Sequence, residues 1–566
     1  MDTRTTVIAG AGVAVAATAA VVAASGALGP NAASLASPTP QEAARLLTQA
    51  TFGVTDDDIA AVQSAGMEGW IDQQMAMQPF STLDFMNQRN DDETLRVEPH
   101  GNFVRSFWIG AINRPDQLRQ RMQFALSQIF VVSRENETLE FDGAFGTGNY
   151  YDLLANNAFG NFRTLLEQVT LNAMMGIFLS FVKNDKEDPA TGRTPDENYA
   201  REVMQLFTIG TVMLNPDGSP QRDRSGNTIP TYTHDDIAGL AKVFTGISWF
   251  SPTPDDGTFL SASNPYIKPM IFYPTHHSTS RKVFLGVVIP ASTTPNPAGD
   301  LKVALDTLFN HPNVGPFIAR RLIQQFVTSN PTPAYIARVA ARFDNNGQGV
   351  RGDLGAVLKA ILLDNEARDT AAAQANPNFG KLREPMIRMT NWGRTFHARS
   401  INGFYEIGET GAPTFLAQGI LDAPSVFNFW RSTYVPPHTR IGDQGLVAPE
   451  FQVLSELTAA SYINVMRFTV DQGIGADITD FSGTDVVSDY TAEVALAATP
   501  EALLDRLNLL LFYGQMSAGL RQQILAAVNA VNIPASPDSA IQAARLNRAK
   551  LAIFLSMVSG EYLTQR

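Results

Sequence analysis

The residues best suited to chemistry lie in one short segment, residues 194–210. Within six residues it holds two carboxylates, an amide and a guanidinium: Glu197, Asn198, Arg201 and Glu202. At about 100° per residue these side chains share one arc of a helix, and pairs spaced four residues apart are within contact range. Two carboxylates beside a cation can separate their pKa values, so that one stays ionised while the other holds a proton. Hydrolases need this division of roles, and it makes Glu197 and Glu202 a candidate acid–base pair.

The same segment also carries the signals of an ordinary helix start. Thr194 is a good N-cap, Pro195 suits the first helical position, and Glu197 completes a capping box three residues after the cap. These signals predict a helix over residues 196–209. A solvated polar face with one ion pair is therefore the alternative to a catalytic cluster, because charged helix faces usually just contact water.

Helical patterns recur along most of the chain and predict one large, mainly α domain with long irregular insertions. This helical domain is expected to span residues 41–566. The expected helices cover residues 41–49, 55–65, 70–77, 113–132, 160–179, 196–209, 234–244, 300–309, 316–328, 332–343, 352–363, 380–396, 449–468, 499–511, 517–528 and 541–558.

Three segments break this helical pattern. Residues 213–232, with the turn sequence Asn215-Pro-Asp-Gly218, predict a small β-hairpin. Residues 248–298 are rich in Pro, Ser and Thr and too long for a simple connection, so we expect an ordered functional loop or a lid. Its aromatic residues can stack on sugar rings, or they can pack the loop onto the core. Residues 403–445 form a second Pro/Gly-rich irregular stretch.

The first 36 residues differ in composition from the rest of the chain. Two charged side chains are followed by a run of Ala, Val, Gly and Ile over residues 7–24, with small residues before residues 37–40. This pattern is typical of a secretory signal peptide that is removed, which predicts a periplasmic or secreted protein. The alternative is an uncleaved anchor, because the apolar run approaches the length of a membrane span. No later segment has that length and apolar content, so we expect no membrane span in the mature chain.

Composition excludes several kinds of site. The chain has no cysteine, so it can hold neither disulfides nor thiolate nucleophiles or ligands, and an exported form must be stabilised by its core. Its formal net charge is −13 at pH 7, and no basic stripe is evident. An acidic chain of this kind has no general attraction for nucleic acid, which is therefore not an expected partner.

Several strings of this sequence resemble the bacterial family catalogued as domain of unknown function 1800. They are Arg45-Leu-Leu-Thr-Gln-Ala-Thr-Phe-Gly53, Trp70-Ile-Asp-Gln-Gln74, Asn157-Ala-Phe-Gly-Asn-Phe-Arg163, Pro195-Asp-Glu-Asn-Tyr-Ala-Arg-Glu202, Tyr232-Thr233, Phe244-Thr-Gly246, Lys282-Val-Phe-Leu-Gly286, Ser329-Asn-Pro331, Glu366-Ala-Arg368, Arg383-Glu-Pro385, Pro424-Ser-Val-Phe-Asn428 and Ala448-Pro-Glu-Phe-Gln452. The resemblance runs from about residue 41 to near the C-terminus. The family usually has His-Asp where this chain has His277-Ser278.

The resemblance implies little about chemistry, because the family has no settled activity. Its members are typically exported, and they often accompany a second uncharacterised family, domain of unknown function 1501, which is similar to sulfatases and phosphatases. A protein of that second family is therefore an expected partner. Fold and neighbourhood alone do not assign a reaction.

The resemblance also names further polar residues that are natural companions of the acid–base pair: His277, Lys282, Arg383 and Glu384. In a helical protein such groups can converge on one polar pocket between helices. In that case Arg201 and Arg383 would hold an anionic substrate group. The other expected substrate-binding residues are Asn198, Lys282 and Glu384. His277 would act as a base or as a neutral metal ligand.

Two of these companions, His277 and Glu384, also have a simpler interpretation. His277 is equally a loop histidine without a chemical role. Glu384 is equally a helix-start acid ahead of Pro385 that pairs with Arg388 four residues later.

A metal site is only weakly signalled. The adjacent pair His276-His277 is not a standard ligand spacing on a helix or a strand. Residues 344–349 resemble a calcium loop, but Gly355 stands where an EF-hand needs a bidentate glutamate. Other calcium binding there or at residues 217–227 stays open, so a divalent metal is a possible cofactor of unknown identity.

Two functions fit these observations. The first is an exported hydrolase or lyase that acts on an extracellular polymer such as polysaccharide, with Glu197, Glu202 and His277 as catalytic groups. The second is a non-catalytic envelope scaffold or chaperone, in which the same side chains form a buried ion-pair network that fixes helix register. The sequence does not decide whether the protein is an enzyme.

Overall fold

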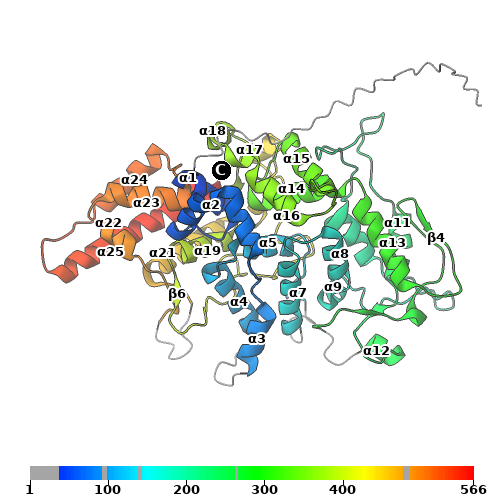
Figure 1. The fold of residues 1–566 in the computed structure, drawn as a ribbon. Coiled ribbons are helices and arrows are strands. Elements are labelled where there is room, and N and C mark those ends of the chain that lie inside the picture. The colour runs from blue at the N-terminus through cyan, green and yellow to red at the C-terminus, as the bar shows by residue number, and fades with distance from the viewer. Residues whose placement is uncertain (1–36, 92–98, 137–142, 262–265, 476–482) are drawn as a thin grey trace, which may run out of the picture. The chain divides into compact units, whose positions relative to one another are not determined.

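Helices dominate the computed structural model, which describes residues 37–91, 99–136, 143–261, 266–475 and 483–566 (Figure 1). Within these residues, β structure is confined to two-stranded antiparallel sheets and isolated bridges. The expected mainly α class is therefore confirmed. The expected signal peptide, residues 1–36, lies outside the described residues.

The helices follow one another along the whole described chain. They are α1 (Pro40–Ala50), α2 (Asp56–Ala76), α3 (Thr82–Asp91), α4 (Pro99–Asn113), α5 (Gln117–Ser127), α7 (Ala144–Asn156), α8 (Phe162–Thr170), α9 (Ala173–Phe178), α10 (Asn198–Glu202), α11 (His234–Ala241), α12 (Asp256–Leu260), α13 (Pro297–Asn310), α14 (Val314–Phe326), α15 (Pro333–Asp344), α16 (Leu354–Leu363), α17 (Asn365–Arg368), α18 (Thr370–Ala375), α19 (Pro385–Thr395), α20 (Arg440–Asp443), α21 (Glu456–Gln472), α22 (Thr491–Leu496), α23 (Pro500–Phe512), α24 (Ala518–Asn529), α25 (Asp538–Met557) and α26 (Gly560–Leu563). A π-helix spans Val203–Thr208, and 3₁₀ turns span Lys242–Phe244, Pro274–His276 and Pro449–Val453.

The strands are short and pair locally or across long sequence distances. The pairs are β1 (Ile247–Ser248) with β2 (Ile271–Phe272), β3 (Lys282–Phe284) with β4 (Val287–Ile289), β5 (Lys381–Leu382) with β8 (Thr564–Gln565), and β6 (Arg399–Ser400) with β7 (Val486–Val487). The β5–β8 pair brings the end of the chain beside the start of α19.

One continuous apolar cluster runs through residues 38–566, which form one compact unit. Near the motif segment its aromatic rings are closely spaced: Phe130 lies 6.0 Å from Phe162 and 5.3 Å from Phe207, between ring centroids. Tyr199 stacks on Phe181 at 4.0 Å. These contacts anchor the apolar side of α10 and the π-helix in the core, so the polar side has a fixed position.

Several helices have other bounds than the sequence pattern predicted. Residues 160–179 contain two helices, α8 and α9, since the Asn172 side chain accepts the N–H of Met174 and caps α9. Residues 113–132 contain only the helix α5. Helix α2 joins two expected helices across Gly66, whose φ of 74° is not helical.

The segment expected as a hairpin folds back through isolated bridges. These join Val212 to Pro230 and Arg222 to Thr228. At its first turn the N–H of Gly218 donates to the carbonyl of Asn215 at 2.9 Å, and Gly218 has a φ of 75°. The segment therefore folds back on itself as expected, but through isolated bridges rather than regular strands.

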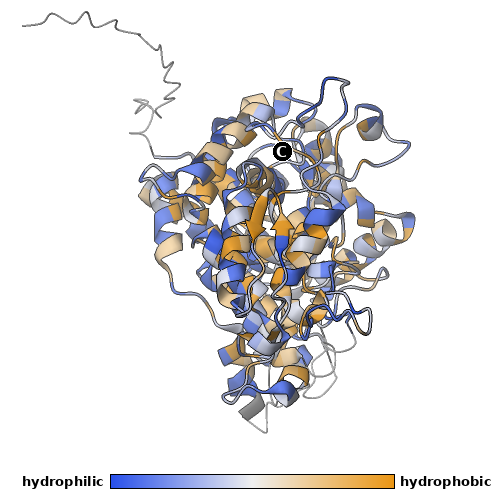
Figure 2. Ribbon diagram, turned by 90° about the vertical axis from the view of Figure 1, so that its right-hand side faces the viewer, coloured by the Kyte–Doolittle hydropathy of each residue, from blue (hydrophilic) through white to orange (hydrophobic). Residues whose placement is uncertain are grey.

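The long segment over residues 248–298 is packed onto the core where it is described. Trp249, Phe259 and Tyr273 are buried, and the Tyr273 hydroxyl donates to the Trp249 carbonyl at 2.7 Å. Its aromatic residues therefore fasten the loop to the protein. Farther along it, the largely apolar β3–β4 hairpin lies against α11 and faces the viewer in Figure 2.

Among the residues that the structure describes, no helix combines the length and the apolar content that a membrane span requires.

The contact between α11 and β3 depends on a glycine. A Cβ added at Gly239 would lie 1.8 Å from the carbonyl oxygen of Val283, so Gly239→Ala must push the helix and the strand apart. We expect a loss of about 1–3 kcal/mol in the free energy of unfolding, measured in urea. Gly69→Ala in α2 is the control, because its Cβ would meet Ala65 at an ordinary 3.6 Å and helical alanine is preferred over glycine. Equal stability of the two variants would contradict this packing.

Candidate functional site

The helix that carries the motif begins later than its sequence signals predicted. Asn184 holds the backbone of Asp196 out of the helix: its side-chain oxygen accepts the Asp196 N–H at 2.8 Å, and its amide donates to the Asp196 carbonyl at 3.2 Å. The Asp196 carboxylate then accepts the N–H of Asn198, the first residue of α10, at 2.7 Å. Thr194 is exposed and outside the helix, so the predicted Thr194 cap and its capping box with Glu197 are wrong. The side-chain amide of Asn184 competes successfully for the backbone.

A π-helix follows α10 without a break and changes which residues share a face. It spans Val203–Thr208, and the Thr208 hydroxyl donates to the Val203 carbonyl five residues back at 2.5 Å. Thr208 is buried. Short π segments inside helices occur frequently at functional sites.

The two motif glutamates occupy contrasting environments. Glu197 is partly exposed and lies 3.4 Å from Arg201, as its spacing predicted, and 3.8 Å from His234. Glu202 is only 6% exposed, and one of its carboxylate oxygens has no hydrogen-bond partner. Burial raises the pKa of Glu202, and the nearby positive charge of Arg201 offsets this in part. Glu202 is therefore the carboxyl group that holds a proton more readily.

Neutral side chains complete this group. The Tyr232 hydroxyl donates to Gln205 at 3.1 Å, and burial together with the charge of Glu202 raises the pKa of Tyr232. The predicted contact between Asn198 and Glu202 is absent; the Asn198 amide donates to the hydroxyl of Ser180 at 3.3 Å. We call the resulting set the motif-helix cluster: Glu197, Arg201, Glu202, Gln205, Tyr232 and His234.

His277 and Lys282 lie in a separate, buried group around Asp300 of α13. The Asp300 carboxylate is 3.1 Å from Nε2 of His277 and 2.8 Å from Nζ of Lys282. The other ring nitrogen of His277 lies 2.8 Å from the carbonyl of Thr245, and the histidine has no exposed surface. These three residues, the Asp300 triad, fasten the long loop to α13. At the next position the Ser278 hydroxyl donates to Glu187 at 2.9 Å.

Glu384 lies in a second buried network. Its carboxylate accepts from Gln128 at 2.6 Å and from Gln418 at 3.0 Å, and it lies 3.4 Å from Lys381. Lys381 also lies 3.1 Å from Glu450, a second buried carboxylate. The predicted pairing of Glu384 with Arg388 is absent, because Arg388 instead donates to a backbone carbonyl. We call this set the Glu384 network: Arg121, Gln128, Lys381, Glu384, Gln418 and Glu450.

The charges of this network act on one another at close range. Burial disfavours ionised Glu384, but Lys381 and Arg121 with the two amide donors hold its pKa below the usual range. Burial raises the pKa of Glu450, against the influence of Lys381, and the neighbouring charge of Glu384 adds to the rise. The network is therefore a buried ion-pair assembly in which Glu384 is the ionised member.

The predicted site residues thus fall into three groups. Among the described residues, no hydrogen bond, ion pair or ring contact joins the motif-helix cluster, the Asp300 triad and the Glu384 network. In Figure 1, α13, which carries Asp300, lies on the right, and α19, which follows Glu384, lies on the left. Arg383 is buried beside α23, where it donates to the carbonyl of Leu511 at 3.2 Å. The predicted site residues therefore do not share one polar pocket.

The part of the chain that the structure describes contains no group of three or more His, Asp or Glu side chains placed to hold a metal ion. In the segment that resembles a calcium loop, the side-chain oxygens of Asn345 and Asn346 accept backbone N–H groups of the loop itself. Asp344 there pairs with Arg351. These oxygens close the turn on itself.

Sequence reasoning missed several members of these groups. Tyr232 and Glu450 lie within strings that carry the family resemblance, so those strings already pointed to them. Asp300 and Gln128 are single polar residues in helical patterns, and nothing in their local sequence marks them.

The stability of the Glu202→Gln variant should depend on pH in a defined direction. Since burial raises the pKa of folded Glu202 above its ordinary value of 4.5, its contribution to stability is complete below pH 4.5 and is lost as the pH rises through the folded pKa. The variant should therefore gain stability relative to the natural protein between pH 4.5 and pH 7. Urea unfolding at both ends of this range measures the gain. A variant that is less stable at pH 7 would show that the ionised carboxylate has a structural partner.

The Glu384→Gln variant should behave in the opposite way. Removing this charge leaves Lys381 and Arg121 under-compensated in the interior, which costs about 3–5 kcal/mol of the free energy of unfolding. Glu68→Gln is the matched control, because it removes a largely exposed pair with Lys359 that is worth less than about 1 kcal/mol. Comparable urea midpoints for the two variants would rule out a structural role of the network.

Comparison with known proteins gives one result that bears on identity. A family model described as "Protein of unknown function (DUF1800)" matches residues 45–564. No curated protein and no solved structure matches the chain. The family match covers nearly the whole chain and confirms the resemblance of its motif strings. The protein therefore belongs to the DUF1800 family of proteins of unknown function.

Proposed function

We propose that this protein is an exported hydrolase or lyase that acts on an extracellular polymer such as a polysaccharide. The observation that carries the proposal is the contrast between its two motif glutamates. Glu202 is buried and has a raised pKa and an unpaired oxygen, whereas Glu197 is partly exposed beside Arg201. Such a division lets one carboxyl group donate a proton while the other accepts one.

In this proposal Glu202 is the general acid and Glu197 the general base. In hydrolysis Glu202 would protonate the leaving oxygen while Glu197 takes a proton from the attacking water. In a lyase Glu197 would take the proton next to a sugar carboxylate, and Glu202 would protonate the oxygen that leaves. Arg201, 43% exposed, is placed to balance an anionic substrate group in either case.

A second observation supports an active rather than a structural role for Glu202. A buried carboxylate without a complete set of hydrogen bonds destabilises a fold, so it persists where function needs it. The π-helix that starts at the next residue is a further feature common at such sites.

The proposal leaves His277 and Glu384 out of the chemistry. Both have their polar atoms engaged by buried partners. Lys282 and Arg383 are likewise buried away from the motif-helix cluster.

Export, partner and substrate rest on sequence alone. The pattern of residues 1–36 supports a periplasmic or secreted location. A protein of the domain of unknown function 1501 family is the proposed partner, and a net charge of −13 argues against nucleic acid.

The competing function is a non-catalytic envelope scaffold or chaperone. The Asp300 triad and the Glu384 network favour it, because both are buried ion-pair assemblies that hold distant segments together. In that case the motif-helix cluster would have no catalytic role.

The two functions are separated by an activity screen with three variants. The purified protein is incubated with neutral and acidic polysaccharides, and new reducing ends and the ultraviolet absorbance of unsaturated sugar products are recorded. We expect Glu202→Gln and Glu197→Gln each to lower kcat by about 10²–10⁴-fold while remaining folded. Glu501→Gln, an exposed glutamate on α23, is the matched control and should retain full activity.

Unchanged turnover in both motif variants would remove the proposed acid–base roles. Absence of cleavage by the natural protein on every polymer, with both variants folded, would favour the scaffold.

A further inference from the structure

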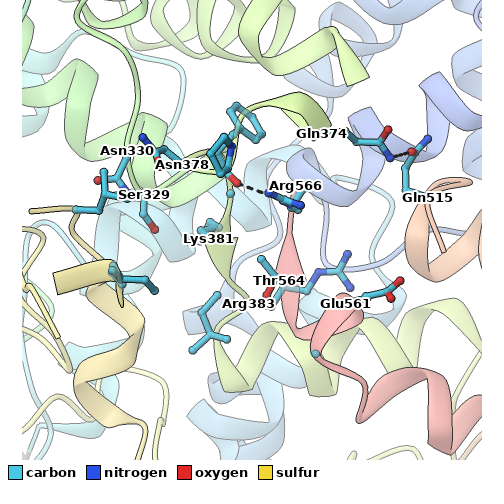
Figure 3. Close-up of a pocket in the computed structure, with 18 of the residues that line it drawn as sticks. Ser329, Asn330, Gln374, Asn378, Lys381, Arg383, Gln515, Glu561, Thr564 and Arg566 are labelled. Atoms are coloured by element: carbon cyan, nitrogen blue, oxygen red, sulfur yellow. Dashed lines mark hydrogen bonds between the residues drawn. The ribbon is translucent and has the colours of Figure 1, made fainter. Parts of the chain in front are cut away.

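A second candidate site lies apart from the motif helix, in a cavity of about 620 Å³ beside the β5–β8 pair (Figure 3). This volume is within the range of small-molecule sites in proteins. Its walls come from segments far apart in the sequence: α1, the turn after α14, β5, residues 446–451, the end of α23 and β8. Neither glutamate of the proposed acid–base pair borders it.

Three arginines border this cavity: Arg45, Arg383 and Arg566. Among the described residues, none of the three forms an ion pair with a carboxylate side chain. Arg45 and Arg383 are 2% and 3% exposed, and each has one guanidinium nitrogen without a hydrogen-bond partner. In a chain with a net charge of −13, three arginines without a paired carboxylate side chain make this cavity a local concentration of positive charge.

The other charged residues of the lining are already engaged. Lys381 lies between Glu384 and Glu450 of the buried network. Glu561, the single acidic residue of the lining, accepts hydrogen bonds from the backbone and the hydroxyl of Ser517 at 2.9 and 2.5 Å. Lys381 and Glu561 therefore form no ion pair with the three arginines.

Neutral contacts hold these guanidinium groups in fixed orientations. Arg45 donates to the carbonyl of Ala367 at 3.0 Å and to the main-chain oxygen of Arg566 at 2.6 Å. Arg383 lies 4.4 Å above the ring of Tyr562. The side chain of Arg566 approaches the carbonyl of Phe379 at 3.5 Å, marked in Figure 3. The arginines are therefore ordered before any ligand binds, which lowers the entropic cost of binding.

A fourth arginine adds to the positive potential behind the cavity wall. Arg368 is close enough to Arg45 that burial and this neighbouring cation lower the pKa of Arg368 to about 9. Burial also lowers the pKa of Arg45. Asp369 and Glu42 oppose these shifts in part, and a bound anion would add negative charge on the cavity side.

The remaining lining is divided between amides and apolar side chains. Asn330, Asn378 and Gln515 provide amide groups. Leu446 and Phe451 belong to an apolar part of the wall that also includes Ile441, Val447, Leu511 and Phe512. A ligand that fills such a cavity needs an anionic group at one end and a hydrocarbon body at the other.

We propose that this cavity binds a small amphiphilic anion, whose carboxylate or phosphate group is held by Arg45, Arg383 and Arg566 and whose hydrocarbon body contacts the apolar wall. Charge-assisted hydrogen bonds from guanidinium groups suit both kinds of anionic group. The site is distinct from the motif-helix cluster and does not depend on its activity.

The test is titration calorimetry of the full-length protein with four probes: octanoate, octyl phosphate, octanol and inorganic phosphate. We expect octanoate or octyl phosphate to bind one site per chain, and which of them binds more tightly identifies the anionic group. Octanol and inorganic phosphate should each bind at least about tenfold more weakly, because each lacks one half of the ligand.

Two variants locate the binding site. Arg566→Gln should weaken binding of the preferred probe at least about tenfold, and its partly exposed side chain makes it the safer variant for folding. Arg383→Gln should do the same if circular dichroism shows it folded. Arg224→Gln, an exposed arginine remote from the cavity lining, is the matched control and should bind normally.

Three results would overturn the proposal. These are no binding of either octyl anion, octanol binding as tightly as octanoate, or full affinity in the folded arginine variants. Inorganic phosphate that binds as tightly as octyl phosphate would exclude the hydrocarbon half of the ligand.

Discussion

The ammonium group of Lys381 is the interaction on which much of the surrounding structure depends. It lies between two buried carboxylates, Glu384 and Glu450, and also donates to the carbonyl of Gln325 at 3.0 Å. These partners belong to the start of α19, the 3₁₀ turn Pro449–Val453 and α14. Isolated charges at these positions would be too costly to bury, so the three segments are stable only together. Arg383 and Phe451 both line the cavity, and each is the chain neighbour of a carboxylate in this pairing.

The motif helix depends on a different constraint, the two hydrogen bonds between the side chain of Asn184 and the backbone of Asp196. By keeping residues before 198 out of the helix, this contact places Glu197 at the N-cap, partly exposed, while Glu202 turns into the protein. The chemical difference between the two carboxyl groups follows from these positions: Glu197 lies at the partly exposed N-cap, and Glu202, at the end of α10, is buried.

Sequence patterns were sufficient where the physics is local. The period of apolar residues predicted the mainly α class, and the gap between the expected helices 55–65 and 70–77 contains Gly66, whose φ of 74° interrupts α2. The i, i+4 spacing predicted the contact of Glu197 with Arg201. In contrast, the residues of the π-helix show no pattern that distinguishes it from an α-helix.

The partners of the polar motif residues could not be predicted, because they come from distant parts of the chain. Glu384 binds Gln128, 256 residues away, and His277 contacts Asp300, 23 residues away. A single glutamine or aspartate within a helical pattern carries no mark of such a contact. The family strings contain many of these polar residues, yet they could not show that the residues lie in three separate groups.

The β5–β8 pair and the contact of Arg45 with Arg566 have a consequence for the order in which the protein can fold. Helix α1 lies near the start of the described chain, but Arg45 finds its partner 521 residues later. A chain that leaves the ribosome N-terminus first exposes α1 long before that partner exists. Closing so long a loop is slow, and β5 can pair with β8 only when almost the entire chain is available. The native state is therefore reached late in synthesis, because an incomplete chain lacks both the β5–β8 pair and the partner of Arg45.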